Sequence, residues 1–287
     1  MTVSTAPSTA PGVDTSLDYK GKIAFVSGGG RGIGLAITRA LAAVGATVII
    51  TWVSQDPAAE VKKITAETGA RVVAYRCAAE KSADVDAVVE RAAAEVGEVD
   101  LVVANAGVCL WRDTIDITDD DLRWIMETNL FGPIYLARAF ARHWLGLPAS
   151  VDPKARGERP AKRNLNKKIL CISSISALVN MTPQVQMSYN ASKAGVTMAC
   201  KSLAGEWAPY GITVNTISPG YVKTDMTMHP PPGEGAAWVK KWGDMTPVDR
   251  FAEPSEIGDL VVLLGSGRAS SFLTGHDIVI DGGYTTY

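Results

Sequence analysis

Residues 22–34 read KIAFVSGGGRGIG. An apolar run is followed at once by a glycine-rich turn, and a helical pattern begins near residue 33. Glycines permit a tight turn and let backbone N–H groups approach a phosphate at the positive end of the helix. Glycine-rich runs often form plain turns, but a strand before the run and a helix after it are the context that a dinucleotide site requires. This stretch therefore predicts a nucleotide-binding turn at the start of an α/β fold.

The alternation of strand and helix continues along the chain. Apolar runs predict seven strands, at residues 22–27, 46–51, 71–75, 100–105, 168–173, 212–217 and 277–280. Helical patterns lie between them, at about 33–44, 57–68, 82–96, 119–143, 188–208 and 254–265. Strands that are apolar on both faces indicate a parallel sheet covered by helices on each side. We therefore expect one doubly wound, Rossmann-like α/β domain over residues 20–287.

Three segments fall outside this alternation. Residues 1–19 are rich in Ser, Thr, Ala and Pro and lack the basic start and apolar core of a secretory signal, so we expect a flexible tail. Residues 146–168 carry seven Lys/Arg against two Asp/Glu and predict a polar surface insertion. Residues 221–250 follow a strand end, where α/β proteins bind ligands, and predict a lid over the substrate.

The composition excludes several partners. The chain has 287 residues, of which 47% are hydrophobic, and a formal net charge of −2, which favours neither nucleic acid nor an anionic membrane. No run approaches the ~18 apolar residues of a membrane helix. The four cysteines and three histidines are scattered, so we expect free thiols and no metal. A reducing cytoplasm is the expected location.

The end of the second strand bears on which nicotinamide cofactor is bound. An acid there would accept a hydrogen bond from the ribose 2′-hydroxyl and would repel a 2′-phosphate. The strand runs out through Thr51, Trp52 and Val53 with no acid before Asp56. Arg31 and Ser54 can both donate to a phosphate at this corner. The pattern favours NADP(H), although Arg31 could simply cover the helix start.

Tyr189 and Lys193 are four residues apart at a predicted helix start, so their side chains share one face. A phenol with a pKa of ~10 is a poor proton donor or acceptor near neutrality, and an adjacent ammonium favours its ionised form. The pair is typical of an acid–base site, although a lone pair of this kind also occurs on helix surfaces.

These motifs together resemble the short-chain dehydrogenase/reductase family over about residues 20–287. The motifs are the G-x-x-x-G-x-G turn, Asn105-Ala106-Gly107, Asn129, Ser174, Tyr189-Asn190-Ala191-Ser192-Lys193, Pro219-Gly220 and Asp281-Gly282-Gly283. They occur in the family's order and are specific as a set.

The resemblance implies a role for each residue of the chemical site. Tyr189 would protonate a carbonyl oxygen as hydride reaches the carbon, and Lys193 would lower the tyrosine's pKa and hold the nicotinamide ribose. Ser174 would donate a hydrogen bond to the same oxygen. Asn129 would join a proton relay through water. The spacing to the tyrosine leaves Ser176 as a second candidate for the serine.

The resemblance also implies a cofactor-binding set. Its members are Gly28, Arg31, Gly32, Ile33, Gly34, Ser54, Asn105, Gly107, Tyr189, Lys193, Pro219, Gly220, Val222 and Thr224. The backbone at Val222 and the Thr224 hydroxyl would bind the nicotinamide carboxamide. Ala78 stands where the family often has an Asp that contacts adenine, so backbone and apolar groups would hold the adenine here.

Within the family, stretches 173–184, 206–209 and 280–285 are similar to one branch. That branch contains fungal and yeast NADP-dependent mannitol dehydrogenases, sorbose reductases, xylulose reductases and carbonyl reductases. It implies a small-molecule substrate, NADPH-dependent reduction of a ketose to a polyol, and a homotetramer built on helices 119–143 and 188–208 and the C-terminal segment. Val53 replaces the Asn that the branch tends to have near the 2′-phosphate, which weakens the preference for NADP(H).

The predicted substrate pocket contains Cys109, Trp111, Asn180, Gln184, Met226 and Trp242. A ketose site needs several fixed polar groups, which Asn180 and Gln184 could supply. Because the other residues are mostly apolar, reduction of an apolar or aromatic ketone in biosynthesis is an open alternative. So is a cofactor-binding protein of this fold recruited to non-redox chemistry.

Overall fold

The computed structural model describes residues 17–149, 160–230, 235–267 and 270–286. These residues form a seven-stranded sheet in the order β3-β2-β1-β4-β5-β6-β7, in which every neighbouring pair is parallel. The strands are β1 (Ile23–Val26), β2 (Thr47–Trp52), β3 (Val72–Arg76), β4 (Leu101–Ala104), β5 (Lys167–Ile172), β6 (Ile212–Pro219) and β7 (Asp277–Ile280). The predicted doubly wound fold is confirmed. The strand order reverses between β1 and β4, and such a reversal opens a ligand crevice at the carboxyl ends of the strands.

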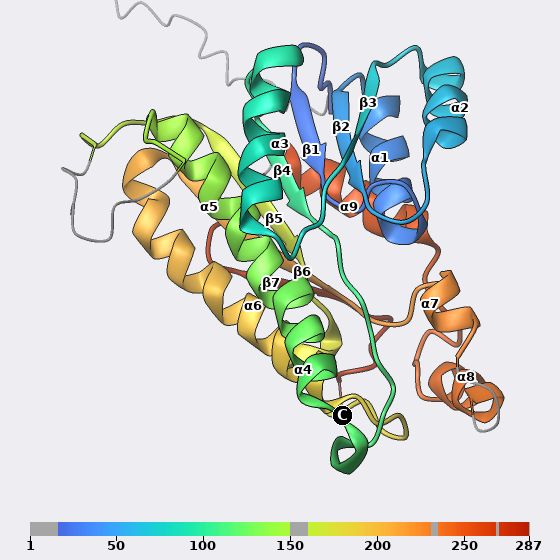
Figure 1. The fold of residues 1–287 in the computed structure, drawn as a ribbon. Coiled ribbons are helices and arrows are strands. Elements are labelled where there is room, and N and C mark those ends of the chain that lie inside the picture. Colours follow the sequence, from blue (N-terminus) through green and yellow to red (C-terminus); the bar gives the residue numbers. More distant parts are fainter. Residues whose placement is uncertain (1–16, 150–159, 231–234, 268–269, 287) are drawn as a thin grey trace, which may run out of the picture.

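Helices cover both faces of the sheet, with α3, α5 and α6 on one side and α1, α2 and α9 on the other (Figure 1). Their bounds are α1 (Gly32–Ala43), α2 (Ala58–Thr68), α3 (Ser82–Glu95), α4 (Asp119–Met126), α5 (Gly132–Leu145), α6 (Met187–Trp207), α7 (Asp225–Met228), α8 (Gly235–Asp244) and α9 (Pro254–Gly265). Short 3₁₀ turns are η1 (Thr114–Asp116), η3 (Ile175–Ala177) and η4 (Ala208–Tyr210). None of the helices in the described ranges is long and apolar enough to span a membrane.

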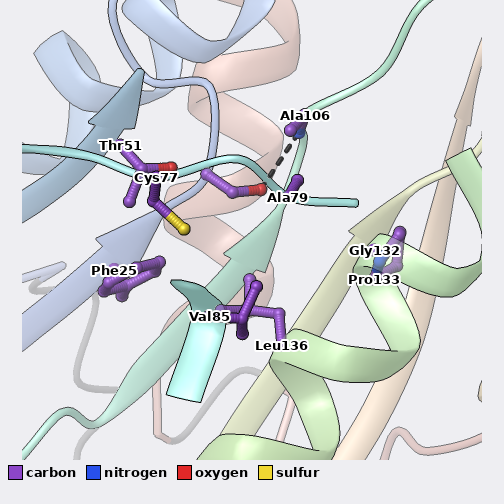
Figure 2. Close-up of a pocket in the computed structure, with 10 residues that line it drawn as sticks. Phe25, Thr51, Cys77, Ala79, Val85, Ala106, Gly132, Pro133 and Leu136 are labelled. Carbon is purple, nitrogen blue, oxygen red and sulfur yellow. Dashed lines mark hydrogen bonds between the residues drawn. The ribbon is translucent and has the colours of Figure 1, made fainter. Parts of the chain in front are cut away.

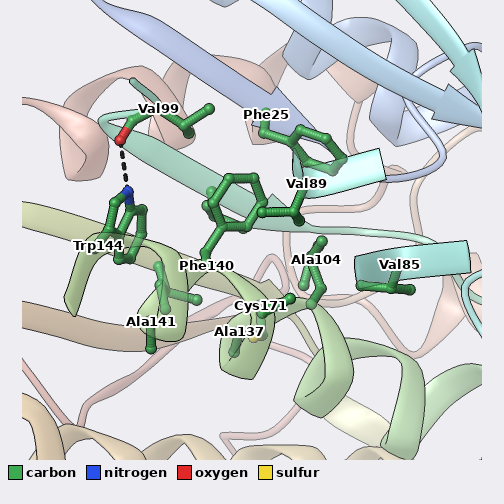
Figure 3. Packing of buried hydrophobic residues seen from close by; sticks show 14 of the residues in the cluster. Phe25, Val85, Val89, Val99, Ala104, Ala137, Phe140, Ala141, Trp144 and Cys171 are labelled. Carbon is green, nitrogen blue, oxygen red and sulfur yellow. Dashed lines mark hydrogen bonds between the residues drawn. The ribbon is translucent and has the colours of Figure 1, made fainter. Parts of the chain in front are cut away.

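Each face of the sheet packs its own apolar core. On the α3/α5/α6 face, Phe25 of β1 meets Phe140 of α5 edge-to-face at 5.0 Å between ring centroids (Figure 3). Trp144 extends this stack and donates its indole N–H to the Val99 carbonyl at 3.0 Å. Residues of α1 and α9 form the second core on the opposite face. The two cores hold the carboxyl ends of the strands in place.

The predicted helix over 119–143 is three elements rather than one. Thr118 and Asp121 form a capping box at the start of α4. A π-helical turn, η2 (Glu127–Phe131), then interrupts the helix before α5, whose first turn contains Pro133. Proline has no N–H to donate to the preceding turn, which suits a break in helical bonding at this point. The break sets the direction of Asn129, at the centre of η2.

The three segments predicted to lie outside the alternation of strands and helices differ in how much of each the structure describes. Residues 221–250 contain two helices, α7 and α8, and in Figure 1 they lie to one side of the sheet; residues 231–234 lie outside the described ranges. Most of the tail (1–16) and the centre of the insertion (150–159) also lie outside them. Lys167 and Lys168 belong to β5 and are buried, so the insertion ends before them.

Candidate active site

The glycine turn between β1 and α1 is closely packed. Gly28 and Gly32 have positive φ angles of 64° and 52°. A Cβ on Gly34 would lie 2.1 Å from the carbonyl oxygen of Gly28. Arg31 precedes α1 without a side-chain cap, and the first turn contains no acid. The N-terminal N–H groups of α1 are therefore free of side-chain caps, which suits a pyrophosphate at this helix end.

Ser27 and Asn105 hold the glycine turn in place. The Ser27 hydroxyl accepts hydrogen bonds from the backbone N–H groups of Asn105 and Ala106, each at 3.0 Å. The Asn105 amide donates to the carbonyls of Ser27 and Gly28 at 3.0 and 3.2 Å. Figure 2 shows the Ala106 bond beside a cavity of about 10 Å³, enough for about one water. Asn105 thus supports the turn through its side chain.

The loop after β6 faces the same turn. A Cβ on Gly32 would lie 3.6 Å from the side chain of Thr224, which begins α7. Gly220 donates its N–H to Ile280 at 2.9 Å, and a Cβ there would lie 2.8 Å from Asp281. Pro219 ends β6 and precedes this contact. The predicted nicotinamide and pyrophosphate residues therefore lie on adjoining loops, as a bound dinucleotide requires.

The corner predicted for the 2′-phosphate is open and carries no acid from β2. Val53 is 47% exposed and Ser54 is exposed. Asp56, the first acid, accepts a hydrogen bond from the N–H of Ala58 at 2.9 Å and so is turned toward the start of α2. Arg31 is exposed at the entrance to α1. The residues present fit a phosphorylated ribose.

Tyr189 and Lys193 lie in the first two turns of α6, and Lys193 reaches the carboxyl end of β5. The Lys193 ammonium is buried, donates to the carbonyl of Ile172 at 2.9 Å, and lies 5.5 Å from the centroid of the Tyr189 ring. A Cβ on Gly107 would lie 3.5 Å from this ammonium. Gly107 therefore leaves room beside the lysine.

Burial dominates the electrostatics of this pair. It lowers the pKa of Lys193 to about 8 and raises the pKa of Tyr189 above its usual value. Hydrogen bonding with Ser174 draws the pKa of the tyrosine back toward the normal range. That Lys193 lowers the pKa of Tyr189 stays a prediction, and burial, the largest cause of the shift in the tyrosine's pKa, acts in the opposite direction.

The two candidate serines occupy different places. Ser174 is half-buried, and its hydroxyl donates to the Ser176 hydroxyl at 3.0 Å. Ser176 is buried and also accepts a bond from the side chain of Gln186 at 3.0 Å. Ser174 therefore interacts with Tyr189, whereas Ser176 lies behind it and holds it in place.

The side chain of Asn129 is held by hydrogen bonds within the protein. Its amide donates to the Val108 carbonyl at 2.8 Å and to the Ser192 hydroxyl at 3.1 Å, and its oxygen accepts from the Val108 N–H at 2.8 Å. Both amide hydrogens are therefore used within the protein. The π-helical turn directs this side chain onto the segment after β4, which it ties to α6.

Gln184 and Trp242 were predicted to face the substrate, and the structure buries both. The Trp242 indole donates to the Gln184 oxygen at 2.7 Å, and the Gln184 amide donates to the Tyr221 hydroxyl at 2.9 Å. Trp242 is fully buried and stacks on Tyr221 at 4.7 Å between centroids. These side chains form an aromatic core that anchors α8. Their polar atoms are already paired within that core.

Gln186, which the sequence reasoning missed, occupies the place expected for Gln184. It is buried, and its amide donates to Ser176 at 3.0 Å and to the Asn190 oxygen at 2.9 Å. Its oxygen accepts from the Trp111 indole at 3.0 Å and from the Cys109 thiol at 3.9 Å. No local sequence pattern distinguishes Gln186 from Gln184. The bend of the chain before α6 directs the side chain of Gln186 toward the serines.

The other predicted pocket residues lie around this network. Burial raises the pKa of Cys109 to about 12, so its thiol is protonated at neutrality. Asn180 is exposed, and its amide donates to Thr182 at 3.1 Å. Met226 is 40% exposed on α7. Asn180 is thus the predicted polar residue that stays at the surface of the site.

Comparison with known proteins identifies the family of this chain. The family model described as short chain dehydrogenase matches residues 22–234. A sorbose reductase of Candida albicans is 35% identical over 98% of this chain and 92% of its own length. An NADP-dependent mannitol dehydrogenase of Hypocrea jecorina is 32% identical over 98% of this chain and 99% of its own.

A solved structure gives the same result in three dimensions. An NADPH-dependent 3-quinuclidinone reductase from Rhodotorula rubra superposes with a TM-score of 0.82 and 29% identity, covering 99% of this chain and 98% of that one. The fold, the glycine turn and the convergence of Tyr189, Lys193 and Ser174 all lie within the matched lengths. The chain is an oxidoreductase that acts on CH–OH or C=O groups, and it belongs to the short-chain dehydrogenase family.

Proposed function

We propose that this protein is an NADPH-dependent reductase that converts the carbonyl of a ketose to the secondary alcohol of a polyol, and catalyses the reverse oxidation. The observation that carries the proposal is the convergence of Tyr189, Lys193 and Ser174 beside a nucleotide-binding turn. The sorbose and mannitol names of its relatives supply the substrate class.

In the proposed reduction, the hydride would come from the cofactor and the proton comes from Tyr189. The bound nicotinamide cofactor would supply the hydride that attaches to the carbonyl carbon. Ser174 donates a hydrogen bond to the carbonyl oxygen, for which its hydroxyl rotates away from Ser176. Tyr189 transfers its phenolic proton to that oxygen and becomes a phenolate. Lys193, mostly protonated at neutral pH with a pKa of about 8, stabilises the phenolate.

Three other side chains are positioning residues in this scheme. Asn129 fixes the segment after β4 to α6, which sets the distance from the nicotinamide side of the site to Tyr189. Ser176 and Gln186 hold Ser174 from behind. We propose these roles for Asn129 and for Ser176, the second candidate for the serine, while the relay through water that Asn129 would join stays a prediction.

The preference for NADPH rests on the corner after β2. That corner has an exposed serine and an arginine on the neighbouring turn, and its first acid is turned toward α2. A 2′-phosphate would meet donors there and no strand-end carboxylate. The NADP-dependent mannitol dehydrogenase among the relatives supports the same choice.

A second substrate class, an apolar or aromatic ketone, is favoured by the wall of the site. Trp111 lies 6.4 Å from Trp238 between ring centroids, and both rings are partly exposed over the buried aromatic core. The indole N–H of Trp111 is already bonded to Gln186, so this wall presents rings rather than donors. Asn180 is then the predicted pocket residue left to serve several sugar hydroxyls.

The deciding experiment follows the oxidation of NADPH and NADH at neutral pH with fructose, sorbose and xylulose beside bulky aromatic and aliphatic ketones. We expect the highest kcat/KM with NADPH and a ketose. Rates confined to apolar ketones would replace the substrate class, and equal KM values for the two cofactors would overturn the NADPH proposal. Cofactor binding without turnover on any ketone would favour the non-redox alternative. A homotetramer and a cytoplasmic location remain predictions, which native mass measurement and fractionation can test.

A further inference from the structure

The last residue of β3 reaches across to the end of β2. Arg76 lies opposite Trp52 in the parallel register of the two strands. Its guanidinium Nε donates to the carbonyl of Val53 at 3.3 Å, one residue past the end of β2. This bond holds the guanidinium over the open corner where Val53 and Ser54 are exposed.

Arg76 differs from its neighbours in its charge partners. Arg39 of α1 binds Glu60 and Glu67 of α2 at 2.9 and 2.7 Å, so these two acids share one guanidinium. Within the described ranges, neither Arg76 nor Arg31 has a carboxylate within ion-pair distance. Arg76 is exposed at the end of β3, and Arg31 follows Gly30, whose Cβ position lies 2.9 Å from Pro57 in the loop after β2. Both arginines therefore border the loop after β2, and Glu80 and Asp84 line the same hollow as Arg76 without an ion pair to it.

We propose that Arg76 is a second phosphate-binding residue of the cofactor site and, with Arg31, binds the 2′-phosphate that distinguishes NADP(H) from NAD(H). With its Nε held by Val53, the guanidinium keeps two terminal nitrogens for phosphate oxygens, the forked geometry in which arginine binds phosphate best. The inference rests on the proposed NADPH function and assigns to β3 a role in cofactor choice that the sequence reasoning placed on Arg31 and Ser54 alone.

Arg76→Met, which matches the arginine side chain as far as Nε and removes its charge, tests the proposal in binding measurements without substrate. Calorimetry with NADP⁺, NAD⁺, 2′,5′-ADP and 5′-ADP measures each affinity. We expect the Kd for NADP⁺ and 2′,5′-ADP to rise about 10- to 100-fold, as for loss of one charge-assisted pair. The Kd for NAD⁺ and 5′-ADP should change less than about twofold.

Arg71→Met is the matched control. Arg71 is exposed just before the first residue of β3 and donates to the Glu95 carbonyl, at the opposite end of the strand from the crevice. Its loss should change none of the four affinities. An equal loss of NADP⁺ and NAD⁺ binding in Arg76→Met, or no loss at all, would overturn the role of Arg76. Equal wild-type affinities for NADP⁺ and NAD⁺ would instead overturn the proposed NADPH function.

Discussion

The nucleotide side and the substrate side of this crevice are built from different parts of the chain. The nucleotide side is mainly backbone, in which glycines allow close approach and the hydroxyl of Ser27 and the amide of Asn105 bind main-chain groups. The substrate side is mainly side chains bonded to other side chains, with Gln186 joining Ser176, Asn190 and Trp111. A site built from backbone groups requires glycines, which form a recognisable pattern in the sequence. A network of hydrogen bonds between side chains requires no such pattern.

The two glutamines before α6 show the same contrast at close range. Gln184 and Gln186 are two residues apart and both are buried, yet one bonds to the aromatic core under α8 and the other to the serines of the site. Residue type and spacing do not separate them. The following variants test whether the two halves are as distinct in function as they are in construction.

The largest effect should come from Tyr189→Phe. This change removes the only proton that the proposed scheme delivers to the carbonyl oxygen, so kcat should fall about 10²- to 10⁴-fold, or about 3–5 kcal/mol in the barrier. The affinity for NADPH, measured by fluorescence titration, should stay within about twofold, because the glycine turn is untouched. Full turnover in the variant would show that another group protonates the substrate.

Gln184→Leu should act on stability rather than on chemistry. It leaves the Trp242 indole and the Tyr221 hydroxyl buried without their partner, which should lower the free energy of unfolding by about 2–4 kcal/mol. Urea unfolding measures this loss, and assays at a temperature where the variant is folded should return nearly normal kcat. A large fall in kcat with unchanged stability would place Gln184 at the substrate after all.

Lys193 should make the cofactor-free protein more stable as the pH rises. Its pKa is about 8 in the folded state and about 10.4 when unfolded, so between these values the unfolded chain binds more protons. The free energy of unfolding therefore gains about 2 kcal/mol from pH 7 to 9.5 relative to Lys193→Met, and this contribution is lost as the pH falls through 8. Urea unfolding of both proteins at each pH gives the difference, in which other titrating groups cancel. A constant difference would mean that the ammonium is not destabilised by burial.

The smallest effect should come from Gln186→Leu. Loss of its bonds to Ser176 and Asn190 should let Ser174 move, and kcat should fall about tenfold, or about 1.4 kcal/mol, with cofactor affinity unchanged. Gln186→Glu keeps the acceptor for Trp111 but loses the amide donors, and it should show a similar fall with a changed pH profile. Normal kcat in both variants would mean that Ser176 holds Ser174 unaided.

The sequence by itself determined the fold and the nucleotide side of this protein. The glycine turn, the seven strands and the Tyr189–Lys193 pair follow from local patterns, since a strand, a tight turn and a shared helix face each depend on residues close together in the chain. The helix predicted over 254–265 follows for the same reason and is α9.

The tertiary structure decided what distant residues do to one another. Burial raises the pKa of Tyr189, the π-helical turn directs Asn129 onto the segment after β4, and the core under α8 uses the polar atoms of Gln184. The position of Arg76 beside Val53 depends on the pairing of β3 with β2. Each outcome depends on desolvation or on contacts between segments far apart in the chain, and local sequence patterns record neither.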